Sequence, residues 1–412
     1  MKIKRLEVLT PQGAAGELTH DSRYVFNYRT TERECEVSLT MPIRAESYAS
    51  GALPPIFSMN RPEGWLQQRI VERMSKHIAI NDMRLLAIVG GNQVGRLDYL
   101  DPNETRANKP AQVGLDQLLH QGQSAEVFAF LVDQYLESGI SGVQPKVLIP
   151  DADRADPDRA TLASANLIVK SAASEYPHLA VNEFLCMEAA RRAGIEVPQF
   201  WLSDDGGLYV MERFDLRGQA RQGFEDMAVL MGKQADTAGR YKYEGSYENI
   251  AKAIALYCRE GEAVRSATRF FEYLALSIMV RNGDAHLKNF GLLYEHPAAG
   301  QSPVLAPLYD VVTTSVYEDI DRHTGRAIAD RTLALKLNKS TQYPPRETLL
   351  QFAAGHCHVR RPGEVLTRIA SAMTETLDAY PDLAPRDFMA RLRREWDGGR
   401  MSMEPAGVFL PR

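Results

Sequence analysis

Cysteine is scarce in this sequence of 412 residues. The four cysteines, Cys35, Cys186, Cys258 and Cys357, lie far apart and form no Cys-x-x-Cys pair. A structural zinc site or a disulfide framework needs cysteines at close or regular spacings, so the sequence predicts neither. Free thiols at this low density favour a reducing compartment, and we expect a cytoplasmic protein.

Long apolar runs are also missing. A membrane helix needs roughly 18 to 20 apolar residues, whereas the best stretch, Leu274 to Val280, ends at Arg281 and Asn282. The first residues, MKIKRLEVLTPQG, alternate charged and apolar side chains as a strand does and lack the apolar core of a secretory signal. We therefore expect a soluble protein with no membrane partner.

The chain carries no excess of positive charge. Lys and Arg number 48 against 53 Asp and Glu, which gives a formal net charge of -5. A protein without a positive field over its whole surface holds nucleic acid phosphates poorly. If DNA matters to its function, we expect a partner to make most of the contacts.

The remaining composition, 44% hydrophobic and 25% charged residues, is that of a globular protein. Domains average roughly 100 to 200 residues, so the length suits two or three of them. The segments RLEVL, RYVFNY and CEVSLTM alternate as strands do, and Trp65 to Ser75 has helical spacing. The polar stretch DPNETRANK follows. These patterns predict a small α/β accessory domain over residues 1–105.

The next region is rich in predicted strands, and the last is rich in helices. After a helical segment from Ser124 to Leu136, PKVLIP and ANLIVK read as a hairpin. His178 to Ala193 has helical spacing, with Gly194 placed to end the helix. Leu208 to Phe214 predicts another strand. We expect an α+β protein with a strand-rich lobe at 106–215 and a mostly helical lobe at 216–412.

The segment VRNGDAHLKNFG contains the side chains that phosphoryl transfer uses. Asp284 and Asn289 are separated by five positions, and Lys288 adjoins the asparagine. An Asp can accept the proton of a hydroxyl nucleophile, a Lys can offset charge on the moving phosphoryl group, and an Asn oxygen can hold Mg²⁺. A polar loop after an apolar helix, in which Asn, Gly and Asp serve only turn chemistry, is the other interpretation.

Two further charged residues lie in apolar surroundings. Asp310 interrupts the strand-like run LAPLYDVV, where a carboxylate costs stability unless it is paired or binds a metal. Upstream, Lys170 ends the run NLIVK, as does the kinase lysine that contacts the α and β phosphates. Glu183 in the following helix is the first candidate for its ion-pair partner, and Glu188 is the second.

Two backbone segments complete a possible nucleotide site. SGISGVQPK, from Ser138 to Lys146, combines glycines, serines and a lysine before a strand, and glycines let backbone amides approach phosphates. MERFD follows the last strand of the strand-rich lobe, where a hinge between lobes would lie. Backbone groups near Glu212 and Phe214 could pair with an adenine edge.

The order of these motifs resembles the HipA family of bacterial toxin kinases. SGVQPK, LIVK, NE in a helix, MERFD, FEDMA, KYEG, NGDAHLKNFGLL, LAPLYDV and LALKLN follow one another over roughly residues 110–340. The earlier LPPIF and NRPEGW resemble the N-terminal subdomain of that family. The resemblance implies a two-lobed protein-kinase-like fold and serine/threonine phosphorylation that uses ATP with Mg²⁺.

The resemblance also assigns roles to positions of this sequence. It makes Asp284 the catalytic base, with His286 and Lys288 facing the γ-phosphate. It places Asn289 and Asp310 on Mg²⁺. The remaining positions that it implies for nucleotide binding are Lys170, Glu183, Gly142, Val143, Gln144, Glu212 and Phe214.

Partners and regulation follow from the same resemblance. It implies a small helix-turn-helix antitoxin of the HipB kind, contact with operator DNA mainly through that antitoxin, and a translation protein as substrate, such as an aminoacyl-tRNA synthetase. Family members phosphorylate a serine of the GxQxK loop in themselves, but the corresponding position here is Gly139. Ser141 is present two positions further on, so we expect Ser141 to be the site, with Ser138 as a weaker substitute.

Two other functions share some of these features. A small-molecule phosphotransferase of the aminoglycoside or choline kinase type has the Asp-x4-Asn core and the later Asp, but it leaves the SGVQPK loop unexplained. A non-catalytic repressor subunit would bind the antitoxin and its operator without catalysis. The intact set of Lys170, Asp284, Asn289 and Asp310 argues against that reading.

Overall fold

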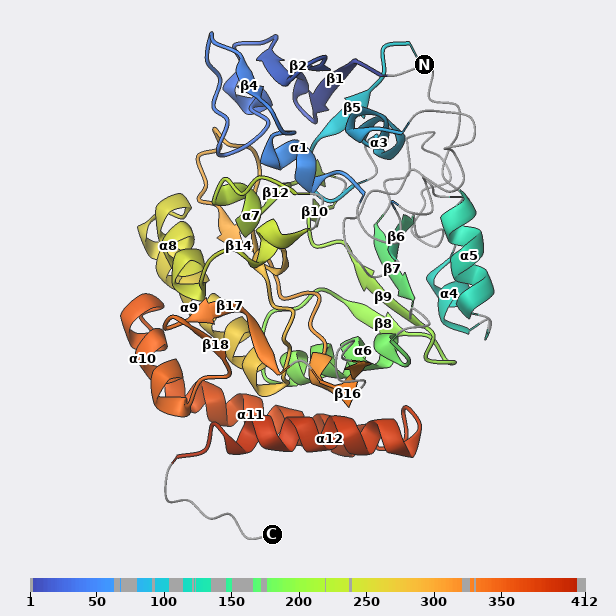
Figure 1. The fold of residues 1–412 in the computed structure, drawn as a ribbon, viewed down its shortest axis with the longest axis vertical. Helices are drawn as coiled ribbons and strands as arrows, with labels where there is room; N and C mark the ends of the chain where they lie inside the picture. The colour runs from blue at the N-terminus through green and yellow to red at the C-terminus, as the bar shows by residue number, and fades with distance from the viewer. Residues whose placement is uncertain are drawn as a thin grey trace. The chain divides into compact units, whose positions relative to one another are not determined.

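The computed structural model describes residues 3–62, 67, 80–90, 93–103, 114–120, 122, 124–134, 146–149, 166–171, 176–218, 220–236, 239–320, 327–329 and 331–405. They form two compact units. Figure 1 labels their helices and strands. Unit 1 draws on Met1–Pro177, Gln199–Lys242 and Gly291–Pro303, and unit 2 on His178–Pro198, Tyr243–Phe290 and Val304–Arg412. Because both units combine separate stretches of chain, the boundaries near residues 105 and 215 stay a prediction.

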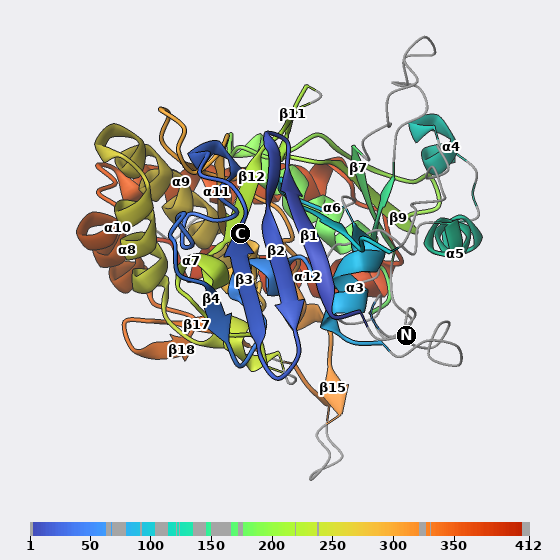
Figure 2. The same cartoon turned by 90° about the horizontal axis from the view of Figure 1, so that it is seen from above.

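Unit 1 begins with an antiparallel sheet whose strands lie in the order β4-β3-β2-β1-β5. Figure 2 shows β4, β3, β2 and β1 in this order. Alternating apolar residues form it, because Leu6, Leu18 and Phe26 are all fully buried on one face. Leu6 pairs with Leu18, and Leu18 pairs with Phe26. The elements of this region are β1 (Arg5–Thr10), β2 (Gly13–His20), β3 (Tyr24–Tyr28), η1 (Arg33–Cys35), β4 (Tyr48–Ser50), α1 (Pro55–Met59), α3 (Asp82–Val89) and β5 (Asp98–Leu100).

A second antiparallel sheet has the order β6-β7-β9-β8. The predicted hairpin is confirmed, since Lys146 pairs with Lys170 and Ile149 with Leu167. The middle strands are apolar, and α5 packs against β7. The elements of this region are α4 (Leu115–His120), α5 (Ser124–Gln134), β6 (Lys146–Ile149), β7 (Leu167–Ser171), β8 (Phe200–Leu202) and β9 (Leu208–Glu212).

The last part of unit 1 follows β9 directly. β12 and β13 pair antiparallel, with Asp226 opposite Gly291. Asp226 also caps the short helix α7, because its carboxylate accepts from the Val229 N–H at 2.9 Å. The elements are β10 (Leu216–Arg217), β11 (Ala220–Arg221), β12 (Gly223–Asp226), α7 (Met227–Leu230), η3 (Arg240–Tyr243) and β13 (Gly291–Tyr294), and the boundary between the units falls at the end of η3.

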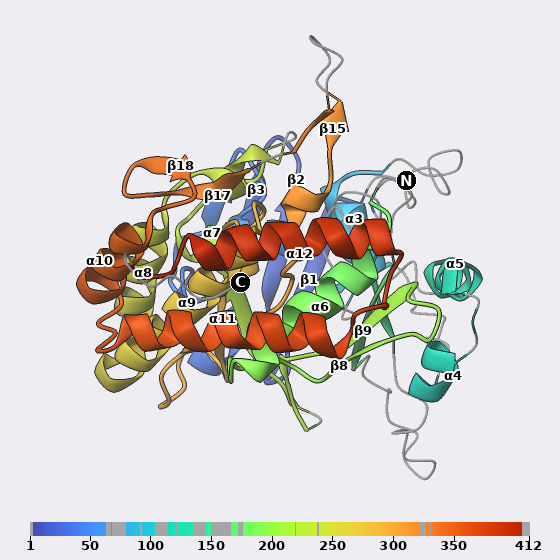
Figure 3. The same cartoon turned by 90° about the horizontal axis from the view of Figure 1, so that it is seen from below.

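Unit 2 is predominantly helical. The helix expected before Gly194 is confirmed as α6 (Leu179–Arg192), and Gly194 has the left-handed φ of 69° that ends it. Figure 3 shows α11 and α12 running side by side, and α11 packs on α6 while α12 packs on α9. The other helices are α8 (Tyr247–Tyr257), α9 (Glu260–Met279), α10 (Arg346–His356), α11 (Pro362–Ala379) and α12 (Arg386–Met401).

Short strands and turns connect these helices. They are η4 (Leu287–Asn289), β14 (Val304–Leu305), η5 (Thr314–Val316), β15 (Asp319–Ile320), β16 (Ala327–Ile328), β17 (Thr332–Leu337) and β18 (Ser340–Gln342). All four cysteines of the chain are buried free thiols. Within the described part of the chain, no helix is both long and apolar enough to cross a bilayer.

The axis of α12 passes very close to the end of α9. A Cβ on Gly399 would lie 1.8 Å from the Met279 carbonyl oxygen, so only glycine permits this crossing. The neighbouring Gly398 has room, because the nearest atom to its Cβ would be a guanidinium nitrogen of Arg281 at 4.0 Å. The crossing fixes the point at which α9 ends and the loop with Asp284 begins.

Candidate active site

The loop after α9 starts with a reversal of the chain. Arg281 has a left-handed φ of 60°, and the Asn282 N–H donates to the Ser277 carbonyl at 2.8 Å. The Gly283 N–H donates to the Thr314 hydroxyl oxygen at 2.7 Å. A Cβ on Gly283 would lie 2.8 Å from the carbonyl oxygen of Thr332, so glycine is required there for close packing. The turn formed by Asn282 and Gly283 therefore sets the position of the residue that follows, Asp284.

The Asp284 side chain is half-exposed. Its N–H donates to the Asn282 side-chain oxygen at 3.0 Å, which fixes the backbone. The Tyr243 hydroxyl donates to Asp284 Oδ1 at 2.7 Å, and His286 Nε2 lies 3.9 Å from the same oxygen. The rings of Tyr243 and His286 meet edge to face, with centroids 5.2 Å apart. The carboxylate is thus accessible and held in orientation at once.

The single turn η4 brings Asn289 to the same place. The His286 N–H donates to Asn289 Oδ1 at 3.0 Å, and Asn289 Nδ2 donates to Asp310 Oδ2 at 3.0 Å. Asn289 and His286 are both buried, at 7% and 6% exposure. The amide therefore joins the loop with Asp284 to a carboxylate 21 positions further along the chain. This contact connects two of the residues singled out in the sequence.

The strand expected around Asp310 is not formed. The structure has only the two-residue strand β14 there, and Asp310 itself adopts a left-handed φ of 63°. Pro307 has no N–H to offer a ladder, and the Leu308 N–H donates instead to the carbonyl of Glu196 at 2.9 Å. A non-glycine residue with a left-handed backbone conformation costs energy. Such a conformation persists where the surrounding structure fixes it, often at functional sites.

Helices α6 and α12 hold the segment that follows Asp310. The Asn182 side chain donates to the Thr313 carbonyl at 3.0 Å and accepts from the Thr313 N–H at 2.8 Å, like a neighbouring strand. The Trp396 indole N–H donates to the Thr313 hydroxyl at 2.7 Å. Burial raises the pKa of the adjoining Cys186 thiol to about 12, so this thiol is packing rather than a nucleophile.

Lys170 and Glu183 are both buried, in different units. Lys170 lies in β7 at 2% exposure, with its ammonium 5.6 Å from the ring centroid of Tyr209. Glu183 is fully buried in α6. The second candidate, Glu188, accepts from the Arg191 guanidinium at 3.0 and 2.5 Å and from the Tyr380 hydroxyl at 2.9 Å. Glu188 therefore has structural partners of its own, and an ion pair of Lys170 with Glu183 stays a prediction.

The segment predicted as the hinge is firmly anchored. The Glu212 N–H donates to the Gln199 carbonyl at 2.8 Å, so this N–H is not free for a nucleotide. Phe214 packs edge to face on Phe224, with ring centroids 5.2 Å apart. Adenine pairing by Phe214 or by the carbonyl groups stays a prediction. Ser141, Gly142, Val143 and Gln144 of the predicted phosphate loop lie outside the described residues.

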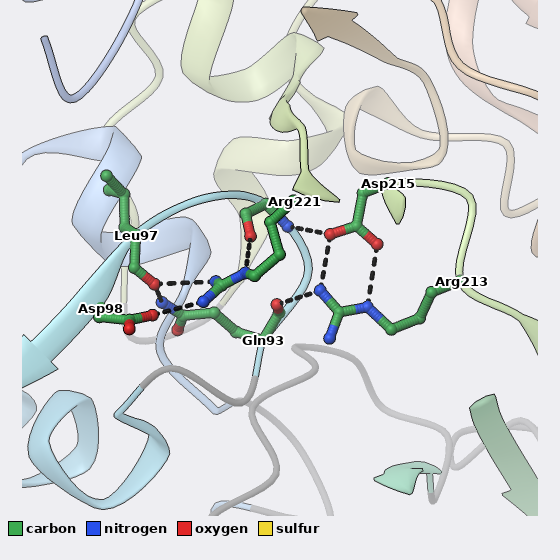
Figure 4. A network of polar contacts seen from close by, with 7 residues as sticks. Gln93, Leu97, Asp98, Arg213, Asp215 and Arg221 are labelled. Atoms are coloured by element: carbon green, nitrogen blue, oxygen red, sulfur yellow. Dashed lines mark hydrogen bonds and ion pairs between the residues drawn. The ribbon is translucent and has the colours of Figure 1, made fainter. Parts of the chain in front are cut away.

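A buried ionic network connects the residues after β9 to the N-terminal sheet (Figure 4). Arg213 forms a bidentate pair with Asp215 at 2.9 and 2.6 Å and donates to the Gln93 carbonyl at 2.6 Å. The Gly95 N–H donates to Asp215 at 2.6 Å. Arg221 donates to the Gly95 carbonyl at 2.8 Å. Hydrogen bonds and a buried ion pair therefore join residues 93–98 to the predicted hinge.

The sequence did not indicate Tyr243, the hydroxyl donor to Asp284. Tyr243 is part of the motif KYEG, to which the sequence assigns no function. The contact joins residues 41 positions apart, and tyrosine has no spacing rule that would connect them. Asn182 was likewise visible only as part of NE in a helix. Contacts of this kind have no local signal.

The chain matches the models of two known protein domains. The sheets and helices define an α+β protein. Residues 138–380 match the HipA-like C-terminal domain, and residues 6–100 match the HipA N-terminal domain. The chain belongs to the HipA family. The predicted α+β fold class and the family resemblance are both confirmed.

Several relatives support this membership. The protein Y4mE of Sinorhizobium fredii, provisionally named a kinase, is 27% identical over 81% of this chain and 83% of its own length. The serine/threonine-protein kinase toxin HipA of Shewanella oneidensis is 25% identical over 46% of each chain. A chain from the solved complex of HipA, HipB and operator DNA of Shewanella oneidensis MR-1 shares the fold, with a TM-score of 0.69 at 19% identity. That match covers 97% of this chain and 96% of the other.

Proposed function

We propose that this chain is an ATP-dependent serine/threonine protein kinase in which Asp284 is the catalytic base. The observation that carries the proposal is the hydrogen bond of 3.0 Å between Asn289 and Asp310. It supports a shared ligand site next to Asp284. The kinase names of the relatives support the same activity.

The donor set fits a magnesium nucleotide. Mg²⁺ takes oxygen ligands, binds through one or two carboxylates, and keeps phosphate and water as its other ligands. Asp310 supplies a carboxylate, and Asn289 lies beside it. Asn289 Nδ2 donates to Asp310, and its Oδ1, which accepts from the His286 N–H, has a second lone pair that a cation could use. Bound Mg²⁺ and ATP would supply the phosphoryl group and neutralise its charge. Asp284 would accept the proton of the substrate hydroxyl, while Lys288, whose carbonyl accepts from Tyr309 at 2.8 Å, and His286 would face the phosphate.

Substitution tests the assignment directly. We expect Asp284→Asn and Asp310→Asn each to abolish transfer of labelled phosphate from ATP to protein, because each removes a charge that the reaction needs. Asp378→Asn is a matched control, because Asp378 is 65% exposed and pairs only loosely with Arg393 at 3.5 Å. Full activity of either site variant, with an unchanged melting temperature, would refute the kinase assignment.

Metal dependence provides a second test. We expect ATP to raise the melting temperature only when Mg²⁺ is present, because Asn289 and Asp310 would hold the nucleotide through the cation. The Asp310→Asn variant should lose this protection. An equal shift with and without EDTA would show that these two residues do not form the site.

We further propose that the kinase is the toxin of a type II toxin-antitoxin module. A HipB-like helix-turn-helix antitoxin would bind it and make most of the contacts to operator DNA, as the net charge of -5 favours. The substrate would be a translation protein such as an aminoacyl-tRNA synthetase. Capture of a small helix-turn-helix protein by the tagged chain from its own cells tests the partner, and phosphoproteomics after induction tests the substrate.

Self-modification at Ser141 belongs to the same proposal. A phosphate there would add about two negative charges near those of ATP and would expel the loop. Mass spectrometry should find phosphate on Ser141 in the unchanged protein and none in Asp284→Asn. Phosphate confined to positions outside 138–146 would show that Gly139 marks a loss of this control.

A further inference from the structure

Two tyrosines four positions apart support the catalytic loop, and they do so in different ways. Tyr247 is fully buried at the start of α8, and its hydroxyl donates to the Ala285 carbonyl at 3.0 Å. That contact holds the backbone. Tyr243 at the end of η3 is 42% exposed, and its hydroxyl donates to the carboxylate of Asp284 at 2.7 Å. A large aromatic side chain left this exposed, with its one polar atom on the catalytic carboxylate, is not explained by packing.

The position of the Tyr243 hydroxyl is fixed from two sides. Its ring meets the buried ring of His286 edge to face at 5.2 Å and 77°. Its backbone is followed by an anchored stretch, because the Lys336 N–H donates to the Gly245 carbonyl at 3.4 Å and the Ser246 side chain caps α8 by accepting from the Asn249 N–H at 3.3 Å. The hydroxyl is therefore held against Asp284 rather than arriving there by chance rotation.

We propose that Tyr243 is a positioning residue for phosphoryl transfer, which donates to Oδ1 of Asp284 so that Oδ2 faces the substrate hydroxyl. The inference rests on the kinase function proposed above. A carboxylate rotates with little resistance about its terminal bond. A hydrogen bond to one oxygen removes this freedom before the substrate arrives. The substrate oxygen then attacks the γ-phosphorus, its proton passes to Oδ2, and the bond to ADP breaks.

The variant Tyr243→Phe removes the hydroxyl and keeps the ring on His286. We expect the rate of labelled-phosphate incorporation at saturating ATP and Mg²⁺ to fall roughly tenfold or more, because a hydrogen bond to a charged group is lost. The KM for ATP and the melting temperature should stay unchanged. This separation of rate from KM distinguishes positioning from a merely structural role.

Tyr380→Phe is the matched control. It removes a tyrosine hydroxyl that donates to another carboxylate, that of Glu188 at 2.9 Å, away from the catalytic loop. Its rate should equal that of the unchanged protein. An equal rate in Tyr243→Phe as well would overturn the inference and leave the kinase assignment intact.

Two other results also overturn it. A faster Tyr243→Phe enzyme would show that the hydroxyl competes with the substrate for Asp284, and a raised KM with an unchanged rate would show a binding role. Absence of transfer by the unchanged protein would refute the proposed function itself, and it would be seen before any variant is compared.

Discussion

The buried pair of Arg213 and Asp215 offers a quantitative test of how unit 1 is held together. Their side chains are 1% and 0% exposed, and two hydrogen bonds of 2.9 and 2.6 Å join them. Replacing Arg213 with Ala leaves the carboxylate of Asp215 with the Gly95 N–H at 2.6 Å as its remaining donor in the network of Figure 4. One neutral donor compensates a buried negative charge only in part.

The magnitude follows from the loss of one partner of a buried ion pair. Such a loss costs about 3 to 5 kcal/mol, because a charge then stays buried without compensation. Removing both charges avoids this cost. In Arg213→Met with Asp215→Leu, the Gly95 N–H and the Gln93 carbonyl lose their partners, at about 1 to 3 kcal/mol for each buried polar group. The apolar replacement returns part of that loss. The double variant should therefore be more stable than either single variant.

Urea unfolding of the unchanged protein, Arg213→Met, Asp215→Leu and the double variant measures the coupling as a double-mutant cycle. Unfolding of a chain with two units need not be two-state, so hydrogen exchange at residues 93–98 should accompany it. Arg213→Ala should expose the amides of this loop to exchange, because Arg213 donates to the Gln93 carbonyl at 2.6 Å. A loss below about 1 kcal/mol, or strictly additive effects, would refute the reasoning and would mean that water reaches the pair.

Two further predictions concern packing and pH. Gly399→Ala should destabilise the protein by about 1 to 3 kcal/mol through overpacking against Met279, whereas Gly398→Ala in the same helix should stabilise it by up to about 1 kcal/mol; comparison of the two melting temperatures tests this. Burial raises the pKa of Glu225 to about 7 from an ordinary 4.5, although hydrogen bonds from Tyr294, Leu39 and Ser38 act to lower it. The folded state thus binds the proton of Glu225 more tightly than the unfolded state does. The stability gained from this proton is largest below pH 4.5 and is lost as pH rises to about 7. Relative to Glu225→Gln, the unfolding free energy should fall by up to about 3 kcal/mol between pH 5 and pH 8, and a parallel pH dependence of the two proteins would contradict the prediction.

The elements that the sequence predicted well are those with a local cause. The hairpin β6–β7 follows from two apolar runs around a polar tip, and α6 follows from helical spacing with a glycine after it. Asp284 and Asn289 were also within reach, because their spacing of five positions is part of one turn. For α6 and for the loop with Asp284, the interacting residues lie within a few positions of one another.

Long-range contacts explain what the sequence could not predict. The apolar run around Asp310 favours a strand, but a left-handed φ of 63° and its bond with Asn289 decide its conformation. Tyr243 lies 41 positions from the carboxylate that it contacts. Glu225 is followed by an aspartate that caps a helix, and nothing in its neighbourhood indicates that its own carboxylate accepts from Ser38, 187 positions away.

The sequence predicted only helical character for the C-terminal helices. In the structure, α12 contacts the chain just before Asp284 and just after Asp310. The matched domain ends at residue 380, before α12 begins at Arg386. From α12, Gly399 lets the helix pack on Met279 where the catalytic loop starts, and Trp396 donates to Thr313 at 2.7 Å just beyond Asp310. Loss of α12 would remove the contact at each point, although it supplies no group to the chemistry. The part of the structure that holds the proposed catalytic loop therefore extends beyond the domain that sequence similarity delimits.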